Sequence, residues 1–243
     1  MRRFWCEKEN ISGDKVYFGK EEAAHIKRVL RMQAGDEMIV SPGDGTDYLC
    51  RLLDLPGCVA QIEETAENGN EPKCELVLFQ GIIKNEKMDY AVQKAAEIGV
   101  ARIVPVICGR TVVKIESEKE KKNKQERWQR IAREACKQCG RSKVPMVDEP
   151  TEFREAVKMF SKLETKLVAY EEEKTKSISS AVVKSKSTGY FIGPEGGIEP
   201  GEYSLLTENG GISVSLGKRI LRAETAAVVC GAVILAFLGE MDI

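Results

Sequence analysis

Two loops in the last third of the chain carry the residues best suited to chemistry. In the first, "FIGPEGGIEPGE" (191–202), glycines at 193, 196 and 197 surround the carboxylate of Glu195, directly after an apolar run. Glycines let the backbone approach a ligand closely or adopt a positive φ. The loop lacks the lysine of a phosphate-binding P-loop. It therefore predicts a ligand held through backbone groups beside an acid.

The second loop, "SLGKRILRAETAA" (215–227), is basic. Its apolar run ends at Gly217, Arg222 precedes a helical pattern that begins near Ala223, and Glu224 falls in the first turn of that helix. The helix dipole stabilises a carboxylate at that position. Taken singly, each loop also fits a tight connection between a strand and a helix, with no chemical role.

Strands and helices alternate from about residue 75 onward. This alternation predicts an α/β fold with a mostly parallel sheet and helices on both faces. Ligands of such sheets bind beyond the carboxyl ends of the strands, so we expect both loops to meet at one edge with a third strand end, "KLVAYEEE" (166–173). The predicted strands are 74–83, 102–108, 143–147, 166–170, 188–193 and 212–217, and the predicted helices are 86–99, 125–139, 151–160, 200–210 and 222–239.

The first 70 residues follow another pattern. Short strand-like runs at 37–41, 47–53 and 58–64 are separated by "PGDG" and "DLPG" turns, which is typical of a hairpin or a small barrel. One amphipathic helix is predicted at 21–31, and "ENGNEP" (67–72) has the composition of a linker.

Composition and missing motifs exclude several classes of protein. The chain of 243 residues is 42% apolar and 31% charged, its longest apolar stretch (226–239) is shorter than the roughly 20 residues of a membrane span, and its start lacks a secretory signal. We therefore expect a cytoplasmic location. No P-loop or G-x-G-x-x-G motif is present, and a single histidine, His25, argues against a Ser-His-Asp site. The eight cysteines favour buried free thiols, because "CKQC" (136–139) has no second pair to complete a zinc site.

Set side by side, the two loops resemble the paired signatures of the SPOUT (trefoil-knotted) RNA methyltransferases. The chain is more narrowly similar to the family in that superfamily that methylates N3 of a uridine in 16S ribosomal RNA, and the resemblance spans nearly the whole sequence. The further stretches that carry it are "MRRFW" at the start, "HIKRVLRMQAGDEMIV" (25–40), "KNEKMDYAVQKAAEIGV" (84–100) and "ERWQRIAREACKQCGRSKVP" (126–145). The family more often has glutamate where this chain has Lys137.

The resemblance implies a PUA-like β-barrel RNA-binding domain over 1–70 and a methyltransferase domain over 71–243 that ends in a trefoil knot. It implies a homodimer that binds S-adenosyl-L-methionine in a bent form, with no metal and no membrane partner. Carried over by motif, the cofactor-binding residues are Tyr170, Glu171, Gly193, Pro194, Gly196, Gly197, Leu216, Gly217, Ile220, Leu221 and Thr225.

The implied reaction suggests roles for three charged residues. Methylation of uridine N3 removes a proton and spreads negative charge to O2 and O4. Arg222 stays protonated and offers a planar fork of donors, so we expect it to hold the base or its developing oxyanion. Glu195 or Glu224 would accept the proton or orient the arginine, and the sequence does not rank the two.

The charge distribution suggests an RNA surface. Residues 71–145 hold 17 basic and 10 acidic side chains, whereas the segments on either side are net acidic. A basic stretch favours a nucleic-acid partner, here the 16S RNA of the small ribosomal subunit, although "EKEKKNKQER" (118–127) also fits a solvated helix. The expected RNA-binding residues are Arg28, Arg31, Lys84, Lys87, Lys94, Arg133, Gln138 and Arg141.

Two other functions fit the same features. One is a knotted methyltransferase of transfer RNA or 23S ribosomal RNA, against which the family-like stretches outside the two loops argue. The other is an RNA-binding assembly factor without catalytic activity, against which the intact Gly193–Gly197 turn and Arg222 argue.

Overall fold

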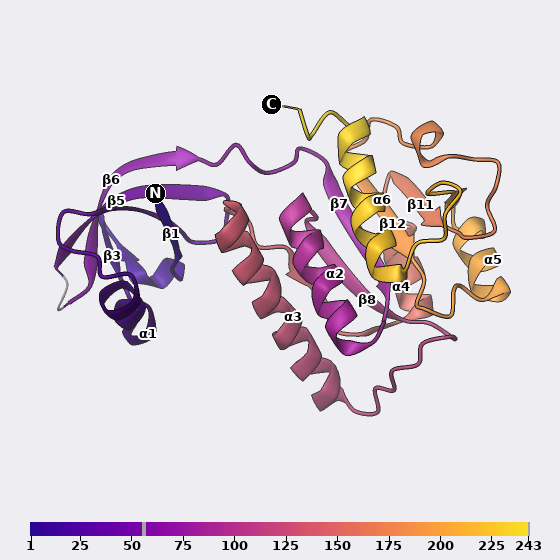
Figure 1. Cartoon of the computed structure of the whole chain (residues 1–243), viewed down its shortest axis with the longest axis horizontal. Coiled ribbons are helices and arrows are strands. Elements are labelled where there is room, and N and C mark those ends of the chain that lie inside the picture. Colours follow the sequence, from indigo (N-terminus) through magenta and orange to yellow (C-terminus); the bar gives the residue numbers. More distant parts are fainter. Residues whose placement is uncertain (55–56, 243) are drawn as a thin grey trace. The chain divides into compact units, whose positions relative to one another are not determined.

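The computed structural model describes residues 1–54 and 57–242 (Figure 1). Two compact units divide the chain. The N-terminal unit comprises Met1–Glu71 and Cys136–Val144, and the C-terminal unit comprises Pro72–Ala135 and Pro145–Ile243. The sequence alone did not indicate that 136–144 groups with the first unit. Of the predicted "DLPG" turn, Leu55 and Pro56 lie outside the described residues.

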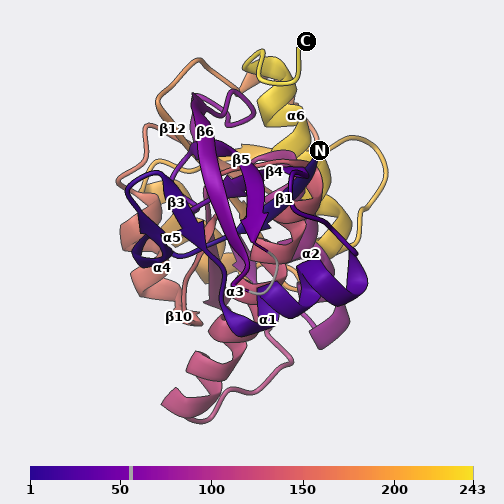
Figure 2. The same cartoon turned by 90° about the vertical axis from the view of Figure 1, so that its left-hand side faces the viewer.

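The N-terminal unit is built on a six-stranded sheet in the order β1-β4-β5-β6-β3-β2 (Figure 2). All pairs are antiparallel except β1 with β4. Side chains such as Phe4, Met38 and Leu52 form its core. The elements are β1 (Arg2–Trp5), η1 (Lys8–Asn10), β2 (Ile11–Ser12), β3 (Lys15–Tyr17), α1 (Lys20–Ala24), η2 (His25–Val29), β4 (Glu37–Ser41), β5 (Thr46–Asp54) and β6 (Val59–Glu67).

The C-terminal unit contains a sheet in which every pair of strands is parallel, as expected from the alternating pattern. The order is β10-β8-β7-β12-β11-β13, with β9 paired to β8. Its strands are β7 (Glu75–Gly81), β8 (Arg102–Ile107), β9 (Met146–Val147), β10 (Thr151–Glu152), β11 (Thr165–Ala169), β12 (Ser187–Ile192) and β13 (Ile212–Val214).

Helices cover both faces of this sheet (Figure 1). Neighbouring residues of β12 show the two faces: Phe191 packs with Phe160 of α4, whereas Tyr190 lies against Gly231 of α6. Helices α2 and α6 contact each other on the Tyr190 face. The helices are α2 (Asn85–Ile98), α3 (Glu118–Cys139), α4 (Phe153–Phe160), η3 (Ile178–Ser180), α5 (Pro200–Glu208) and α6 (Ala223–Phe237).

Several predicted elements are shorter than expected, among them the strand predicted at 212–217, which is β13 (Ile212–Val214). The strand predicted at 143–147 is only the two-residue β9, because Cys136–Val144 belongs to the other unit and Pro145 has no amide to donate. The helix predicted at 151–160 begins at Phe153, since Thr151 and Glu152 pair with β8 instead. Among the described residues, no helix is both long and apolar enough to cross a membrane. All eight cysteines are free thiols, and all but Cys139 are buried.

A buried ion pair joins the two chain segments of the N-terminal unit. The Glu71 carboxylate accepts hydrogen bonds from Arg141 (Nη2, 2.8 Å) and from the amides of Ser142 (3.0 Å) and Lys143 (2.9 Å). Arg141 is 4% exposed. The expectation that Arg141 contacts RNA phosphate is therefore corrected, because its guanidinium is buried against a carboxylate.

We predict that Glu71→Ala destabilises the protein by about 3–5 kcal/mol, since removing one partner leaves a charge buried without its counter-ion. The measurement is the free energy of unfolding in urea. Glu155→Ala is the matched control: it removes an exposed carboxylate that pairs with Lys158 one turn away, and it should cost less than about 1 kcal/mol. Equal stability of the two variants would refute the structural role of Glu71.

A second close contact involves the end of β7. A Cβ at Gly81 would lie 2.5 Å from the backbone nitrogen of Pro194, just beyond β12. We predict that Gly81→Ala lowers the free energy of unfolding by about 1–3 kcal/mol through overpacking. Gly201→Ala, in α5, meets no atom within 4 Å and should leave stability equal or higher. Unchanged thermal unfolding of Gly81→Ala would contradict this packing.

Candidate functional site

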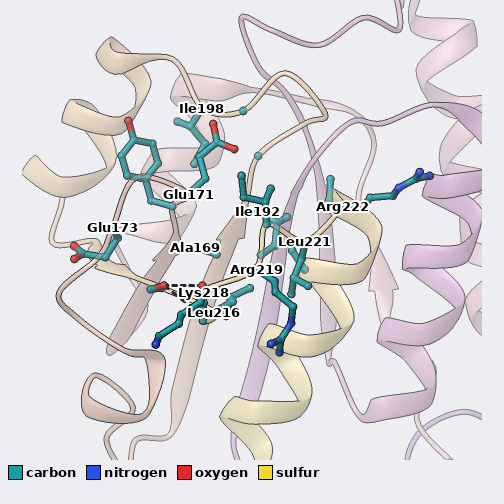
Figure 3. Close-up of a pocket in the computed structure, with 18 of the residues that line it drawn as sticks. Ala169, Glu171, Glu173, Ile192, Ile198, Leu216, Lys218, Arg219, Leu221 and Arg222 are labelled. Carbon is teal, nitrogen blue, oxygen red and sulfur yellow. Dashed lines mark hydrogen bonds between the residues drawn. The ribbon is translucent and has the colours of Figure 1, made fainter.

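A pocket of about 890 Å³ opens at the carboxyl ends of β11, β12 and β13 (Figure 3). Three loops supply most of its lining, and we name them by their residues: the acidic loop (170–177), the glycine loop (193–198) and the arginine loop (215–222). Parallel pairing of the three strands places their carboxyl ends on one edge. The pocket therefore lies where the sequence predicted the loops to meet.

Most of the residues expected to bind a cofactor line this pocket. Ile192, Ile198 and Leu221 add apolar walls. Gly196 and Thr225 are not part of the lining. Those that line it are Tyr170, Glu171, Gly193, Pro194, Gly197, Leu216, Gly217, Ile220 and Leu221.

The glycine loop is a tight turn whose backbone excludes larger residues. The amide of Gly197 donates to the carbonyl of Pro194 at 2.9 Å, and Gly197 has a φ of 77°. A Cβ at Gly193 would lie 2.8 Å from Cγ1 of Ile198. The positive φ at position 197 and the close approach at position 193 explain why the sequence places glycines there.

Neighbouring elements hold the glycine loop on two sides. The Glu195 carboxylate accepts from the backbone amide of Lys84, at the start of α2, and from Nζ of Lys87, both at 3.3 Å. A carboxylate at a helix N-terminus is favoured by the helix dipole. From the loop after β8, Nη1 of Arg110 donates to the carbonyl of Gly196 at 3.0 Å. Sequence reasoning missed Arg110, because no local pattern links it to a loop 86 residues away.

Side-chain contacts within the acidic loop and with helix α5 fix the conformation of this loop. Tyr170 stacks on Tyr203 of α5 with ring centroids 4.1 Å apart. One oxygen of Glu173 accepts from the Thr175 hydroxyl at 2.6 Å, the Thr175 amide at 2.7 Å and the Lys176 amide at 3.0 Å. These hydrogen bonds, led by that of the Thr175 hydroxyl, lower the pKa of Glu173 to about 2, so its carboxylate is charged at neutral pH.

The arginine loop is joined to the acidic loop through Ser215. The Ser215 amide donates to the carbonyl of Lys176 at 2.8 Å, and the Ile178 amide donates to the carbonyl of Ser215 at 3.2 Å. Farther along this loop, Ile220 is 84% exposed.

The three expected catalytic residues lie in different environments. Arg222 lines the pocket, and its side chain forms no hydrogen bond or ion pair within the described residues. That side chain extends in a different direction from Lys218 and Arg219 (Figure 3). Glu195 also lines the pocket but is held at the start of α2. Glu224 lies outside the lining, with its Oε2 buried and without a hydrogen-bond partner in the described structure.

The residues expected to bind RNA are not one group. Lys87 pairs with Glu195, and Lys94 pairs with Glu97 at 2.7 Å. Lys84 and Arg133 belong to the C-terminal unit, whereas Gln138 belongs to the N-terminal unit with Arg28, Arg31 and the buried Arg141. Those with exposed side chains are Arg28, Arg31, Lys84, Arg133 and Gln138.

The chemistry available here is that of backbone groups, apolar walls and a guanidinium. Within 1–54 and 57–242, no group of three or more His, Cys, Asp or Glu is placed to hold a metal ion. Apolar walls with a few polar groups suit a flat, uncharged ring, and an arginine side chain without a partner in the described structure suits developing negative charge.

Comparisons with known proteins match nearly the whole chain. The family model described as "RNA methyltransferase domain" covers residues 70–235, and that described as "RNA methyltransferase PUA domain" covers 18–63. Ribosomal RNA small subunit methyltransferase E of Bacillus subtilis is 37% identical over 240 residues, covering 93% of each chain. Its counterpart in Synechocystis is 34% identical over 95% of this chain and 76% of its own.

A solved structure of a protein with the same name as these relatives is also similar to this chain. Ribosomal RNA small subunit methyltransferase E from Neisseria gonorrhoeae, crystallised with S-adenosyl methionine, superposes with a TM-score of 0.86 at 32% identity, covering 97% of each chain. Since the first family model matches more than half of the residues and the relatives match nearly end to end, the chain belongs to the ribosomal RNA small subunit methyltransferase E family of RNA methyltransferases.

Proposed function

We propose that this protein transfers the methyl group of S-adenosylmethionine to N3 of one uridine in 16S ribosomal RNA, in the decoding region of the small ribosomal subunit. The observation that carries the proposal is the pocket in which the glycine loop and the arginine loop meet at the carboxyl ends of β11, β12 and β13. The RNA methyltransferase family and the relatives named for ribosomal RNA of the small subunit support it.

The cofactor occupies the pocket between the three loops. Ile198, Leu216 and the backbone of the glycine loop would hold its flat, uncharged adenine ring. Since Glu195 and Arg110 hold this loop from two sides, the wall is formed before the cofactor arrives. Preorganisation of this kind lowers the entropic cost of binding.

Arg222 acts on the base. Removal of the N3 proton places negative charge on the pyrimidine oxygens until the methyl group is transferred to N3, and a guanidinium supplies donors that stay protonated. Two carboxylates remain candidates to accept the N3 proton. Glu195 already accepts two hydrogen bonds, so we assign it to anchoring the glycine loop. Glu224 has a buried oxygen without a partner among the described residues, which leaves it able to orient Arg222 or take the proton.

We further propose a homodimer and an RNA-holding role for the PUA-like N-terminal unit. Helix α6 supports the dimer, because it is apolar all round yet leaves Val228, Val229 and Val233 only partly buried and Phe237 59% exposed. The C-terminal trefoil knot stays a prediction from the resemblance.

The decisive experiment is mass spectrometry of 16S RNA from a strain that lacks this gene. We predict the loss of one 3-methyluridine, restored when purified protein and S-adenosylmethionine are added to isolated small subunits. Persistence of that nucleoside in the deletion strain would reject the proposal. A missing methyl group in transfer RNA or 23S RNA instead would identify the alternative substrate, and a complete set of modifications would favour a non-catalytic assembly factor.

We predict that Arg222→Ala lowers the rate constant of methyl transfer by about 10²- to 10³-fold, as expected for removal of one donor to a developing oxyanion. Because the cofactor meets the loops largely through backbone and apolar groups, its Kd by calorimetry should change less than twofold. The control is Arg154→Ala, which removes an exposed arginine of α4 away from the pocket. Wild-type turnover in Arg222→Ala would refute its catalytic role.

A further inference from the structure

The mouth of the pocket carries four cationic side chains that the sequence did not single out. Lys174 and Lys176 belong to the acidic loop, and Lys218 and Arg219 belong to the arginine loop. All four are exposed and line the pocket, and none forms an ion pair or side-chain hydrogen bond within the part of the chain that the structure describes. We call these four residues the basic rim.

The backbone fixes the two halves of the basic rim beside each other. Ser177 and Ser215 form a parallel bridge, in which the Ser215 amide donates to the carbonyl of Lys176 itself. The turn that presents Lys218 is also held, because the Gly217 amide donates to Oγ of Ser215 at 3.3 Å and Gly217 has a φ of 108°. The cations are therefore arranged by main-chain contacts and not by acidic partners.

Nearby carboxylates do not neutralise the rim. Glu173 directs one oxygen to the backbone and hydroxyl of its own turn. Glu171 lies beside Ile198, across the pocket from Lys218 and Arg219 (Figure 3). The Glu172 carboxylate interacts with the Tyr170 hydroxyl. Partial burial and this carboxylate raise the pKa of Tyr170. Four positive charges on fixed loops thus face solvent at one side of the pocket.

We propose that the basic rim binds the phosphates that flank the target nucleotide in the RNA substrate. The inference rests on the proposed function and assigns residues that it does not use. A nucleotide that enters the pocket brings its own backbone to the mouth, and cations placed there meet it without having to break an ion pair first. Phosphate contacts of this kind position a nucleic acid without reading its sequence, which leaves recognition of the base to the pocket and Arg222.

The test compares three double variants of the full chain: Lys218→Ala with Arg219→Ala, Lys174→Ala with Lys176→Ala, and, as a control, Lys158→Ala with Lys162→Ala. The control removes two exposed lysines outside the pocket. The substrate is the small ribosomal subunit from the deletion strain. Affinity is measured between 50 and 200 mM salt, together with kcat, the KM for subunits, the Kd for S-adenosylmethionine and the sedimentation coefficient.

We expect each rim variant to bind subunits on the order of tenfold more weakly near 0.1 M salt. The slope of log K against log salt should fall by about 1.4, because about 0.7 is lost per phosphate contact to single-stranded RNA. The KM should rise with little change in kcat, and cofactor affinity and sedimentation should match the control. A slope equal to that of the control would overturn the proposal. So would weaker cofactor binding, which would place the cofactor carboxylate at the rim, or altered sedimentation, which would place the rim in a subunit interface.

The two proposals fail in different ways. If wild-type protein binds subunits but does not methylate N3, the proposed reaction is wrong, and the salt dependence of binding still decides the role of the rim. If wild-type protein methylates N3 and the rim variants behave like the control, only the rim is refuted.

Discussion

The parallel pairing of β11 with both β12 and β13 is the constraint on which the site depends. It sends three successive loops out of the same edge of the sheet, so residues more than 40 positions apart line one pocket. Strand order also reverses where β7 meets β12, the kind of position at which open parallel sheets bind ligands. Gly81 permits this arrangement because it leaves room for Pro194 beyond the neighbouring strand.

The acidic and the basic side chains that line the pocket differ in their hydrogen bonding. Glu195 and Glu173 each accept several hydrogen bonds that shape a loop. Arg222 and Lys218 have no such partner within the described residues. Acids that fold the walls and cations that stay available suit a ligand that arrives with negative charge or develops it. A binding site for a metal ion would require the opposite distribution.

Sequence reasoning succeeded where the signal is local. Alternating apolar runs predicted the parallel sheet, and glycines after a run predicted the tight turn at Gly197. It failed where one residue depends on a distant partner. Nothing around Arg141 indicates that Glu71 buries it, and nothing around Arg110 indicates that it bonds to Gly196. In the sequence, Lys174 and Lys176 look like ordinary solvent-exposed residues of a loop. Only the bridge between Ser177 and Ser215 in the structure places them at the pocket.

The glycine loop is held by hydrogen bonds to neighbouring elements, whereas the Arg222 side chain has no partner within the described residues. This difference affects how such a site accelerates a reaction. Binding energy raises the rate only where it is stronger in the transition state than in the ground state. Under the proposed function, the glycine loop is fixed in advance and so contributes to cofactor binding in both states. Under the same proposal, the Arg222 side chain, unpaired within the described structure, gains its hydrogen bonds when charge develops on the base. An arginine already paired with a carboxylate would have to break that pair first, and Glu195 pairs with Lys87 instead.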